Sequence, residues 1–408
     1  MINVVIFGTG GICEKIQYYF TDKVNIVAYL DNNESKWNSL FKGKKIISPE
    51  KILEISFEYI IIASSYYSEI YEQLIGMGIL KKYIINYKDE SLLCNLQICS
   101  CDLQIISNQS RIFNEIQNAN KLYETNLFLN AKLLTNNMLN KESIKNIQDA
   151  EFKVFSQWGE DGIIQYIINN IDIKNKFFIE FGVENYIESN TRFLLCNNNW
   201  QGLIMDGSES NIEYIKNDEI YWKYNLNAVC EFITKENINS IIKANCTQTE
   251  IGLLSIDVDG VDYWIWKEID CINPIVVVCE YNAVFGDKLK VTVPYEKSFF
   301  RTEKHYSNLY WGASLQAFIE LGKEKGYSFI GSNSAGNNAF FIKNEYYDSI
   351  GSKINEVKYS LSHYRESRDK HGKLTFLSGE DRLEEIKKME IYNLDDSFIQ
   401  KIEEVYKL

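Results

Sequence analysis

Short apolar runs alternate with amphipathic segments over the first ninety residues. The runs are rich in Ile and Val, and in the segments apolar residues recur every three or four positions. The runs span 2–7, 24–30 and 59–63, and the amphipathic segments span 11–21 and 67–78. Strands that alternate with helices indicate a parallel sheet. We therefore expect residues 1–90 to form a Rossmann-like α/β domain.

A second set of apolar runs begins after residue 150, and these runs are almost uninterrupted. They span 177–183, 202–206, 252–258 and 275–281. Continuous apolar strands are typical of a parallel sheet that is buried on both faces. Near the end, "YSFIGSNSAGNNAFFIK" has a Gly/Asn/Ser turn between two strand-like runs, which predicts an antiparallel hairpin. We expect residues 151–343 to form a second Rossmann-like α/β domain that ends in this hairpin.

The region between the two domains, 91–150, has no strand signal after its first residues. Ile112, Ile116, Leu122 and Leu134 recur at roughly helical intervals among polar residues. We predict a helical linker, for which two interpretations stay open. Either it packs on the flanking domains, or residues 108–150 join two copies into a homodimer. The charged tail, 344–408, is predicted to be a helical extension.

Composition narrows the classes of partner. The formal net charge is -13, with 43 Lys and Arg against 56 Asp and Glu. This balance argues against a broad nucleic-acid-binding face, which needs clustered cations. The apolar runs are far shorter than the roughly 20 residues of a membrane-spanning helix, and "MINVVIFGTGG" lacks the basic segment of a signal peptide. We expect a cytoplasmic protein without nucleic-acid or membrane partners.

Acidic residues stand where the predicted strands of the second domain end. The first strand ends in "IEFGV" with Glu180 and Gly182, and the second ends at Asp206. "LLSIDVDG" ends at Asp257 and "VVVCEYN" at Glu280. Open α/β sheets bind ligands outside the carboxyl ends of their strands. The sequence therefore predicts an acidic ligand site at this edge.

These motifs resemble a known family. The segments "SQWGEDGII", "FIEFGV", "GLIMDGS", "LLSIDVDGVDYWIW", "CEYNAVFG" and "GNNAFFIK" are similar to the FkbM-type branch of the class I S-adenosylmethionine-dependent methyltransferases, over about 151–343. The family's usual glycine loop is incomplete here, since only Gly182 remains. The resemblance implies a parallel sheet finished by an antiparallel hairpin, and S-adenosylmethionine as cofactor.

The resemblance also implies roles for individual residues. Glu180 and Gly182 would line the methionine part of the cofactor. Asp206 would accept the ribose hydroxyls, with Ser208 near the adenosine. Asp257 would lie beside the sulfonium and the incoming nucleophile. Finally, Gln157 would close the cofactor pocket.

A metal and a general base are further candidates. Asp257, Glu280 and Asn282 are similar to the ligands of magnesium-dependent catechol-type O-methyltransferases, and Mg²⁺ prefers oxygen ligands. The structural alternative is that Asp259 and Asp262 cap the following helix and that Glu280 bonds neighbouring backbone. His305, in a loop-like polar and aromatic stretch, is the candidate general base, and a surface histidine without a role is the alternative.

The first domain carries its own glycine loop, "VVIFGTGG". With Gly8, Gly10 and Asp31 it resembles the small nucleotide-sugar-binding domains attached to bacterial sugar-modifying enzymes, which implies that these residues lie at the ligand. Such a loop is a weak signal for any one nucleotide. Nucleotide-sugar binding, a structural role and NAD binding therefore stay open.

Together these features favour an O-methyltransferase. We expect it to methylate a hydroxyl of a sugar, a nucleotide-activated hexose or heptose used for a bacterial surface polysaccharide such as a capsule. Two alternatives remain at this point. One is a bifunctional, NAD-linked sugar-modifying enzyme, and the other is a non-catalytic scaffold that binds a nucleotide sugar.

Overall fold

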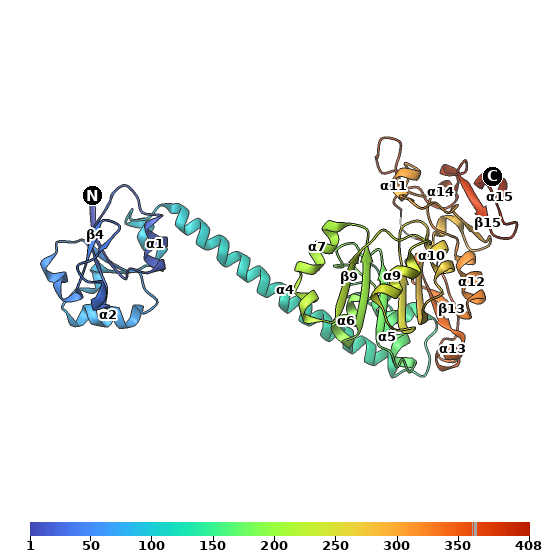
Figure 1. Cartoon of the computed structure of the whole chain (residues 1–408), viewed down its shortest axis with the longest axis horizontal. Coiled ribbons are helices and arrows are strands. Elements are labelled where there is room, and N and C mark those ends of the chain that lie inside the picture. Colours follow the sequence, from blue (N-terminus) through green and yellow to red (C-terminus); the bar gives the residue numbers. More distant parts are fainter. Residues whose placement is uncertain (361, 363–364) are drawn as a thin grey trace. The chain divides into compact units, whose positions relative to one another are not determined.

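A computed structural model describes residues 1–360, 362 and 365–408, and for residues 101–110 it describes the backbone only. The chain divides into two compact units, Met1–Tyr123 and Glu124–Leu408 (Figure 1). Helix α4, Cys101–Leu139, runs from the first unit into the second. This long helix agrees with the predicted helical linker, and it occupies most of that region.

The first unit is built on a six-stranded sheet with the order β3-β4-β2-β1-β5-β6. All neighbouring strands are parallel except β3 and β4. The strands are β1 (Ile2–Phe7), β2 (Val24–Leu30), β3 (Leu40–Phe41), β4 (Lys44–Ile47), β5 (Tyr59–Ile62) and β6 (Ile84–Asn86). The helices are α1 (Gly11–Gln17), α2 (Tyr67–Gly76) and α3 (Glu90–Asn95), with short 3-10 helices at Glu34–Lys36, Pro49–Glu54 and Lys81–Tyr83.

Successive residues of the central strand β1 enter different apolar clusters. Ile6 joins one cluster with Ile61, and Val5 joins the other with Ile60. Side chains alternate between the two faces of a strand, so a strand that is apolar throughout is buried on both faces. The first unit thus has the predicted Rossmann-like layering of helices around a parallel sheet.

The second unit contains a seven-stranded sheet with the order β13-β14-β11-β10-β7-β8-β9. Strands β7 to β11 are parallel, and β14 is antiparallel to both β11 and β13. The strands are β7 (Phe177–Phe181), β8 (Gln201–Asp206), β9 (Leu226–Cys230), β10 (Glu250–Ile256), β11 (Asn273–Glu280), β13 (Tyr327–Ser332) and β14 (Asn338–Lys343). Parallel strands finished by an antiparallel hairpin confirm the predicted fold class.

Helices cover both faces of this sheet (Figure 1). Their bounds are α5 (Glu160–Asn170), α6 (Arg192–Asn198), α7 (Glu209–Asn217), α8 (Glu219–Lys223), α9 (Ile238–Asn245), α10 (Asp262–Glu268), α11 (Arg301–Lys304), α12 (Leu315–Glu324) and α13 (Asn344–Gly351), with 3-10 turns at Ile147–Ala150 and Ala283–Phe285. Leu253 of β10 packs with α5 and α6 residues, and Leu254 packs with α9 and α10 residues. The aromatic residues Tyr263 and Trp266 are buried in the second of these clusters.

The C-terminal extension differs from the helical prediction. It contains the helices α14 (Glu380–Glu385) and α15 (Ile402–Tyr406), but also a hairpin of β15 (Glu390–Asn393) and β16 (Phe398–Lys401). Strand β15 pairs with β12 (Val291–Thr292). The sequence "EIYNLDDSFIQK" explains the difference, since an Asn/Asp/Ser turn separates two runs with β-branched and aromatic residues.

Among the residues that the structure describes, no helix is both long enough and apolar enough to cross a membrane.

Candidate active site

The strand register brings the predicted acidic residues to one edge of the second sheet. Phe181 of β7 pairs with Met205 of β8 and with Ile256 of β10. Ile256 in turn pairs with Cys279 of β11. The residues that follow these strand positions, among them Asp206, Asp257 and Glu280, therefore leave the sheet next to one another. This is the edge at which ligands bind in open parallel sheets.

Gly182 is required for this close approach. Its φ is +68°, and an ideal Cβ at this position would lie 1.6 Å from the carbonyl oxygen of Asp257. No side chain fits at that distance. The Gly182 N–H donates to the carbonyl of Met205 at 2.9 Å. Glycine thus allows the loop after β7 to pack directly on the backbone that carries Asp257.

A cavity of about 610 Å³ opens at this edge. Its volume lies in the range of small-molecule and cofactor sites. Predicted site residues are well represented in its wall: Gln157, Glu180, Gly182, Asp206, Ser208, Asp257, Glu280 and Asn282 all line it. The structure therefore collects in one hollow the second-domain residues that the sequence analysis proposed, with the exception of His305.

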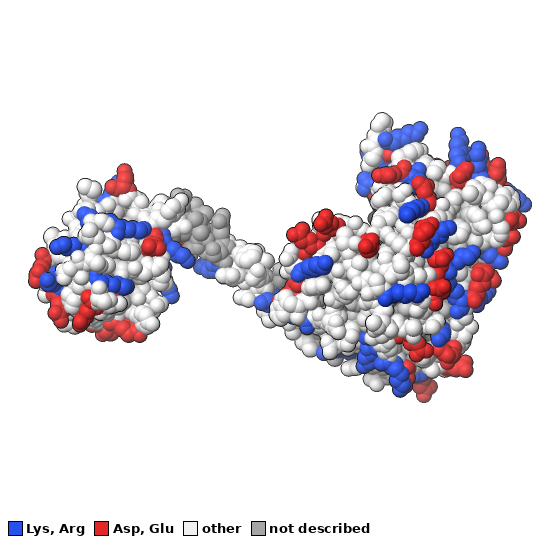
Figure 2. Space-filling view, in the orientation of Figure 1, with Lys and Arg blue, Asp and Glu red and all other residues white. Residues whose placement is uncertain are grey.

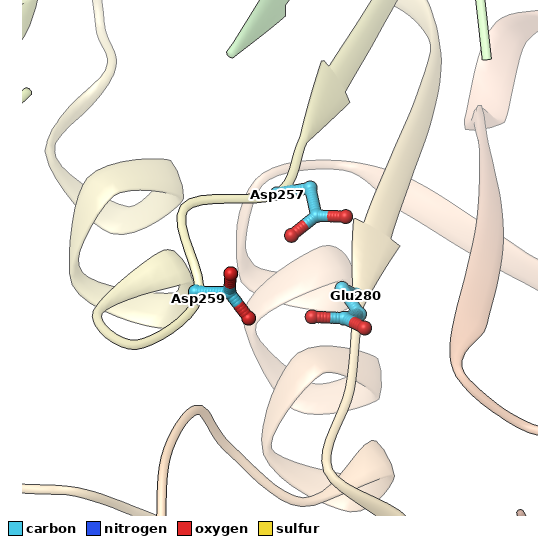
Figure 3. Close-up of side chains that lie close together, drawn as sticks. All are labelled: Asp257, Asp259 and Glu280. Atoms are coloured by element: carbon cyan, nitrogen blue, oxygen red, sulfur yellow. The ribbon is translucent and has the colours of Figure 1, made fainter. Parts of the chain in front are cut away.

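Three carboxyl groups converge inside the cavity, those of Asp257, Asp259 and Glu280 (Figure 3). One oxygen of each lies within 4.8 Å of one oxygen of each of the others. Asp257 and Glu280 are partly buried, whereas the side chain of Asp259 is 62% exposed. Arg301 Nη1 lies 3.1 Å from Asp259 Oδ1, and its guanidinium stacks over the ring of Trp311. Arg301 therefore pairs directly with the exposed member of the acidic cluster.

The crowding of these acids changes their proton affinity. Burial, and then the neighbouring charges of Glu280 and Asp259, hold the pKa of Asp257 well above its ordinary value. Burial and the charge of Asp259 raise the pKa of Glu280 to about 8. The Oε2 atom of Glu280 is buried and has no hydrogen-bond partner. The cluster thus has a strong need for a positive partner, either a proton or a metal ion.

Two of the nearby polar residues have structural roles instead. Asn282 Nδ2 donates to the carbonyls of Leu309 and Trp311, and its Oδ1 accepts from the N–H of Val284. Its amide is thus already engaged, and Asp259 takes its place in the acidic set. Asp262 does not cap the helix that it begins, since α10 has no side-chain cap; its carboxylate accepts instead from the N–H groups of Val258 and Gly260 in the preceding loop.

Glu180 lines the cavity but is held by its own chain. Its carboxylate accepts from the Ser189 hydroxyl at 2.6 Å and from the N–H of Asn190 at 2.9 Å. The N–H and hydroxyl of Thr191 also donate to it. Burial raises its pKa in spite of these hydrogen bonds. Glu180 therefore fixes the 189–191 loop, and through it the side chain of Asn190 that faces the cavity.

Asp206 is fixed in a similar way at the end of β8. Its Oδ1 accepts from the Ser208 N–H at 2.8 Å and from Asn211 Nδ2 at 3.0 Å, and its Oδ2 accepts from the Glu184 N–H at 2.9 Å. A carboxylate has about four lone-pair sites, so capacity remains for a ligand hydroxyl. The hydroxyl of Ser208 caps α7 by accepting from the Asn211 N–H.

The segment after β9 adds residues that sequence reasoning missed. Glu231, Phe232 and Ile233 line the cavity next to Asp206. The ring of Phe232 lies 5.3 Å from the ring of Phe300, which comes from the loop before α11. The short strand "LNAVC" contains a polar residue and no Ile, so its apolar pattern is weak. The sequence therefore gives no clear signal for this strand, and the structure places it beside β8.

The loop before α5 carries Gln157 and is itself well anchored. The adjacent acids are both buried: Glu160 accepts from the N–H groups of Trp158 and Gly159, and Asp161 accepts from three more N–H groups of residues 154–156. Burial raises the pKa of Asp161 to about 6. These contacts explain the acidic pair in "SQWGED", which holds Gln157 and Trp158 at the cavity wall.

His305 is not among the residues that line the cavity. Its Nδ1 lies 2.7 Å from the Ser307 hydroxyl, and its ring stacks on Tyr306. Burial lowers its pKa. The imidazole therefore supports the loop that carries Arg301 and Trp311, and it does not reach the acidic cluster.

The glycine loop of the first unit has a simpler geometry. Gly8 has a φ of +108°, and a Cβ there would lie 2.8 Å from the Ala63 carbonyl, whereas a Cβ at Gly10 would meet nothing within 4 Å. Asp31 accepts from Lys36 at 2.8 Å and from the Thr9 hydroxyl. Burial would raise the pKa of Asp31, but these hydrogen bonds outweigh it and the pKa is lowered. Asp31 thus already has a cationic partner.

Comparison with known proteins gives one family match and several distant structural likenesses. Residues 1–85 match the family model described as "C2185-like, N-terminal". No curated protein matches the chain. An S-adenosylmethionine-dependent methyltransferase from Clostridium acetobutylicum ATCC 824 is 9% identical, with 45% of this chain and 90% of that chain covered and a TM-score of 0.29.

Two further structures are also distant likenesses. A putative caffeoyl-CoA O-methyltransferase from Staphylococcus aureus is 15% identical, over 45% of this chain and 82% of that chain, with a TM-score of 0.30. UDP-D-quinovosamine 4-dehydrogenase from Vibrio fischeri is 14% identical, over 21% of this chain and 75% of that chain, with a TM-score of 0.17. Likenesses at this level do not assign an activity.

Proposed function

We propose that this protein is an S-adenosylmethionine-dependent O-methyltransferase that acts on a hydroxyl of a sugar. The observation that carries the proposal is the convergence of Asp257, Asp259 and Glu280 in a cavity that Asp206 and Phe232 also line. One part of that cavity suits an adenosine. The other part suits a hydroxyl that has to lose its proton.

The cofactor half is built from polar and apolar groups at adjacent strand ends. Asp206 offers a fixed carboxylate to ribose hydroxyls, and Phe232 and Ile233 offer apolar surface to the adenine ring. The methionine part would then lie along Gly182, Asn190 and Gln157. When bound, the cofactor supplies an electrophilic methyl group on a sulfonium cation. The acidic wall favours a cationic ligand of this kind.

The acidic cluster fits a divalent cation such as Mg²⁺. Asp257, Asp259 and Glu280 would hold it, since oxygen ligands and few protein groups suit this metal. The buried and unpartnered Oε2 atom of Glu280 supports this assignment, as does the mutual repulsion that raises the pKa of Asp257. A bound cation would supply Lewis acidity that makes a nearby hydroxyl easier to deprotonate.

Asp257 is the proposed proton acceptor for the acceptor hydroxyl. It belongs to the acidic cluster, and Gly182, which lines the proposed cofactor half, packs on its backbone. In the metal-free cluster its raised pKa would make it a better general base than an ordinary carboxylate. Methyl transfer needs in-line placement of the two reactants, so the rigid backbone contact at Gly182 serves positioning.

The far wall of the cavity supports a sugar as acceptor. Asn337, Ser362, Glu366 and Arg301 offer hydrogen-bonding groups there, and Trp311 lies beneath the guanidinium of Arg301. A few polar groups beside an aromatic ring suit a polyhydroxylated ring. We extend the proposal to a nucleotide-activated hexose or heptose for a surface polysaccharide. The open space at Gly10 in the first unit supports a nucleotide-binding role there.

Mass spectrometry tests the activity directly. The full chain is incubated with S-adenosylmethionine, Mg²⁺ and a panel of free and nucleotide-linked sugars. We expect one sugar to gain a single methyl group, and to lose that gain when Mg²⁺ is chelated. Two outcomes would refute the sugar assignment for a protein that binds S-adenosylhomocysteine. One is that no sugar gains a methyl group, and the other is that all sugars gain one without preference. A titration with NAD checks the first unit, because binding there would favour the NAD-linked alternative.

A further inference from the structure

Helix α4 presents an apolar stripe that the described part of the chain does not cover. Seven large apolar side chains of α4 are between 52% and 66% exposed. Six of them form the stripe, namely Ile112, Ile116, Leu122, Tyr123, Leu129 and Leu133, and the seventh, Phe113, lies about 100° around the helix from Ile112. Apolar side chains that are exposed singly are normal on a soluble protein, but a contiguous row of them marks an interaction surface.

The stripe lies away from the face of α4 that packs on the second unit. Ala131 is buried, and Phe128 contacts the rings of Phe155 and Phe193. At 100° per residue, Leu129 and Leu133 point away from this packed face. Within the second unit, the described residues therefore cover one side of the helix and leave Leu129 and Leu133 exposed.

The spacing of the stripe is that of a coiled coil. Ile112, Ala119, Asn126 and Leu133 are seven residues apart in turn, and so are Leu122 and Leu129. A repeat of seven residues keeps an apolar seam facing a second helix along its whole length. A helix that packs on the flat surface of a sheet does not need such a repeat. The partner that this spacing fits is thus another long helix.

A second copy of α4 fits the stripe best. Asn126 lies near the middle of the seam, and a central polar residue of this kind is typical of paired helices, where it fixes the register at some cost in stability. Between residues 112 and 133 only Glu115, Lys121, Glu124 and Lys132 are charged. Glu115 lies on the seam, seven residues before Leu122, whereas Lys121, Glu124 and Lys132 lie beside it. The two negative and two positive charges give this stretch no net charge, and the face of it that Figure 2 shows has few charged side chains.

The surface is also large enough for a stable pair. Twelve side chains that each lose roughly 100 Å² of exposed surface, as an upper limit, would give an interface of about 1,200 Å². Specific interfaces begin at about this size. We propose that two copies of this protein dimerise through a coiled coil of their α4 helices, with Asn126 inside the seam. This specifies the homodimer interpretation of residues 108–150.

Sedimentation of the full chain at micromolar concentration tests the pairing. We expect a mass of twice the 47.6 kDa of one chain. Leu122→Lys and Leu129→Lys should each weaken dimerisation by about tenfold or more, because a lysine enters the seam. Leu53→Lys is the matched control, since Leu53 is 69% exposed but lies outside α4. It should leave the mass unchanged.

A substitution with the opposite sign makes the test specific. Asn126→Leu should tighten the dimer, since it removes the polar residue from the seam. Gln117→Leu, on the outer face of the same helix, should not. Circular dichroism checks that each variant keeps its helix. A monomeric wild-type chain, a dimer that tolerates both lysines, or equal effects of Asn126→Leu and Gln117→Leu would each overturn the proposal.

Discussion

Replacement of Gly182 by alanine probes the contact that positions Asp257. Two costs add at this residue. The first is conformational, because a φ of +68° is unfavourable for alanine by about 1–2 kcal/mol. The second is steric, because the new Cβ would lie 1.6 Å from the Asp257 carbonyl oxygen. Overpacking of this kind costs a further 1–3 kcal/mol or so.

Gly326→Ala separates these two costs. Gly326 directly follows the C-cap of α12 and has a φ of +84°, but a Cβ there would meet nothing within 4 Å. It therefore carries only the conformational cost of about 1–2 kcal/mol. The excess loss in Gly182→Ala measures the contact with the Asp257 backbone.

Thermal unfolding of the second unit gives the comparison. One kcal/mol corresponds to about 2–4 °C for a domain of this size. We expect Gly326→Ala to lower the melting temperature by a few degrees, and Gly182→Ala to lower it by about twice as much or more. Equal losses in the two variants would refute the close approach of the β7 loop to Asp257.

Three further predictions concern the cavity. Asp257→Asn should reduce turnover by about 10²–10⁴-fold with little change in cofactor affinity. Asp270→Asn, an exposed control, should change neither quantity. Equal losses in turnover and cofactor affinity would contradict the role of Asp257 as a base. Phe232→Ala should weaken binding of S-adenosylhomocysteine by about 1 kcal/mol, roughly fivefold, in a calorimetric titration; an unchanged constant would remove the adenine from this site. The pKa of Asp257 is raised, and that of Glu280 is raised to about 8. The native state therefore binds more protons than the unfolded state. The stability of the metal-free protein should therefore fall as pH rises from about 5 through 8, and Mg²⁺ should raise the melting temperature more at the upper end of this range. A Mg²⁺ effect independent of pH would contradict the acidic site.

The sheet and its acidic edge were predictable because strands and their ends have local signatures. The runs that end at Asp206 and Asp257 are mostly apolar, and the carboxyl ends of parallel strands share one edge. The sequence could not show which acids face one another. Asp259 joins the cluster through a backbone turn with a φ of +54°, which no periodicity reveals.

The predictions about Asn282, His305 and the tail show where sequence reasoning stops. Asn282 stands at the expected strand end, but three backbone groups take up its amide. His305 has suitable chemistry, yet its loop turns it toward Ser307 and Tyr306. Such outcomes depend on tertiary hydrogen bonds. The β15–β16 hairpin was masked by the charged residues around it.

The most direct test of the methyltransferase account is a calorimetric titration of the full chain with S-adenosylhomocysteine. We predict one site in the wild type and an affinity lower by about 1–3 kcal/mol in Asp206→Ala, which removes a buried acceptor. Glu209→Ala, which removes an exposed carboxylate three residues away, should bind like the wild type. A folded wild-type protein that gives no heat, or an Asp206→Ala variant that binds as tightly, would contradict the account.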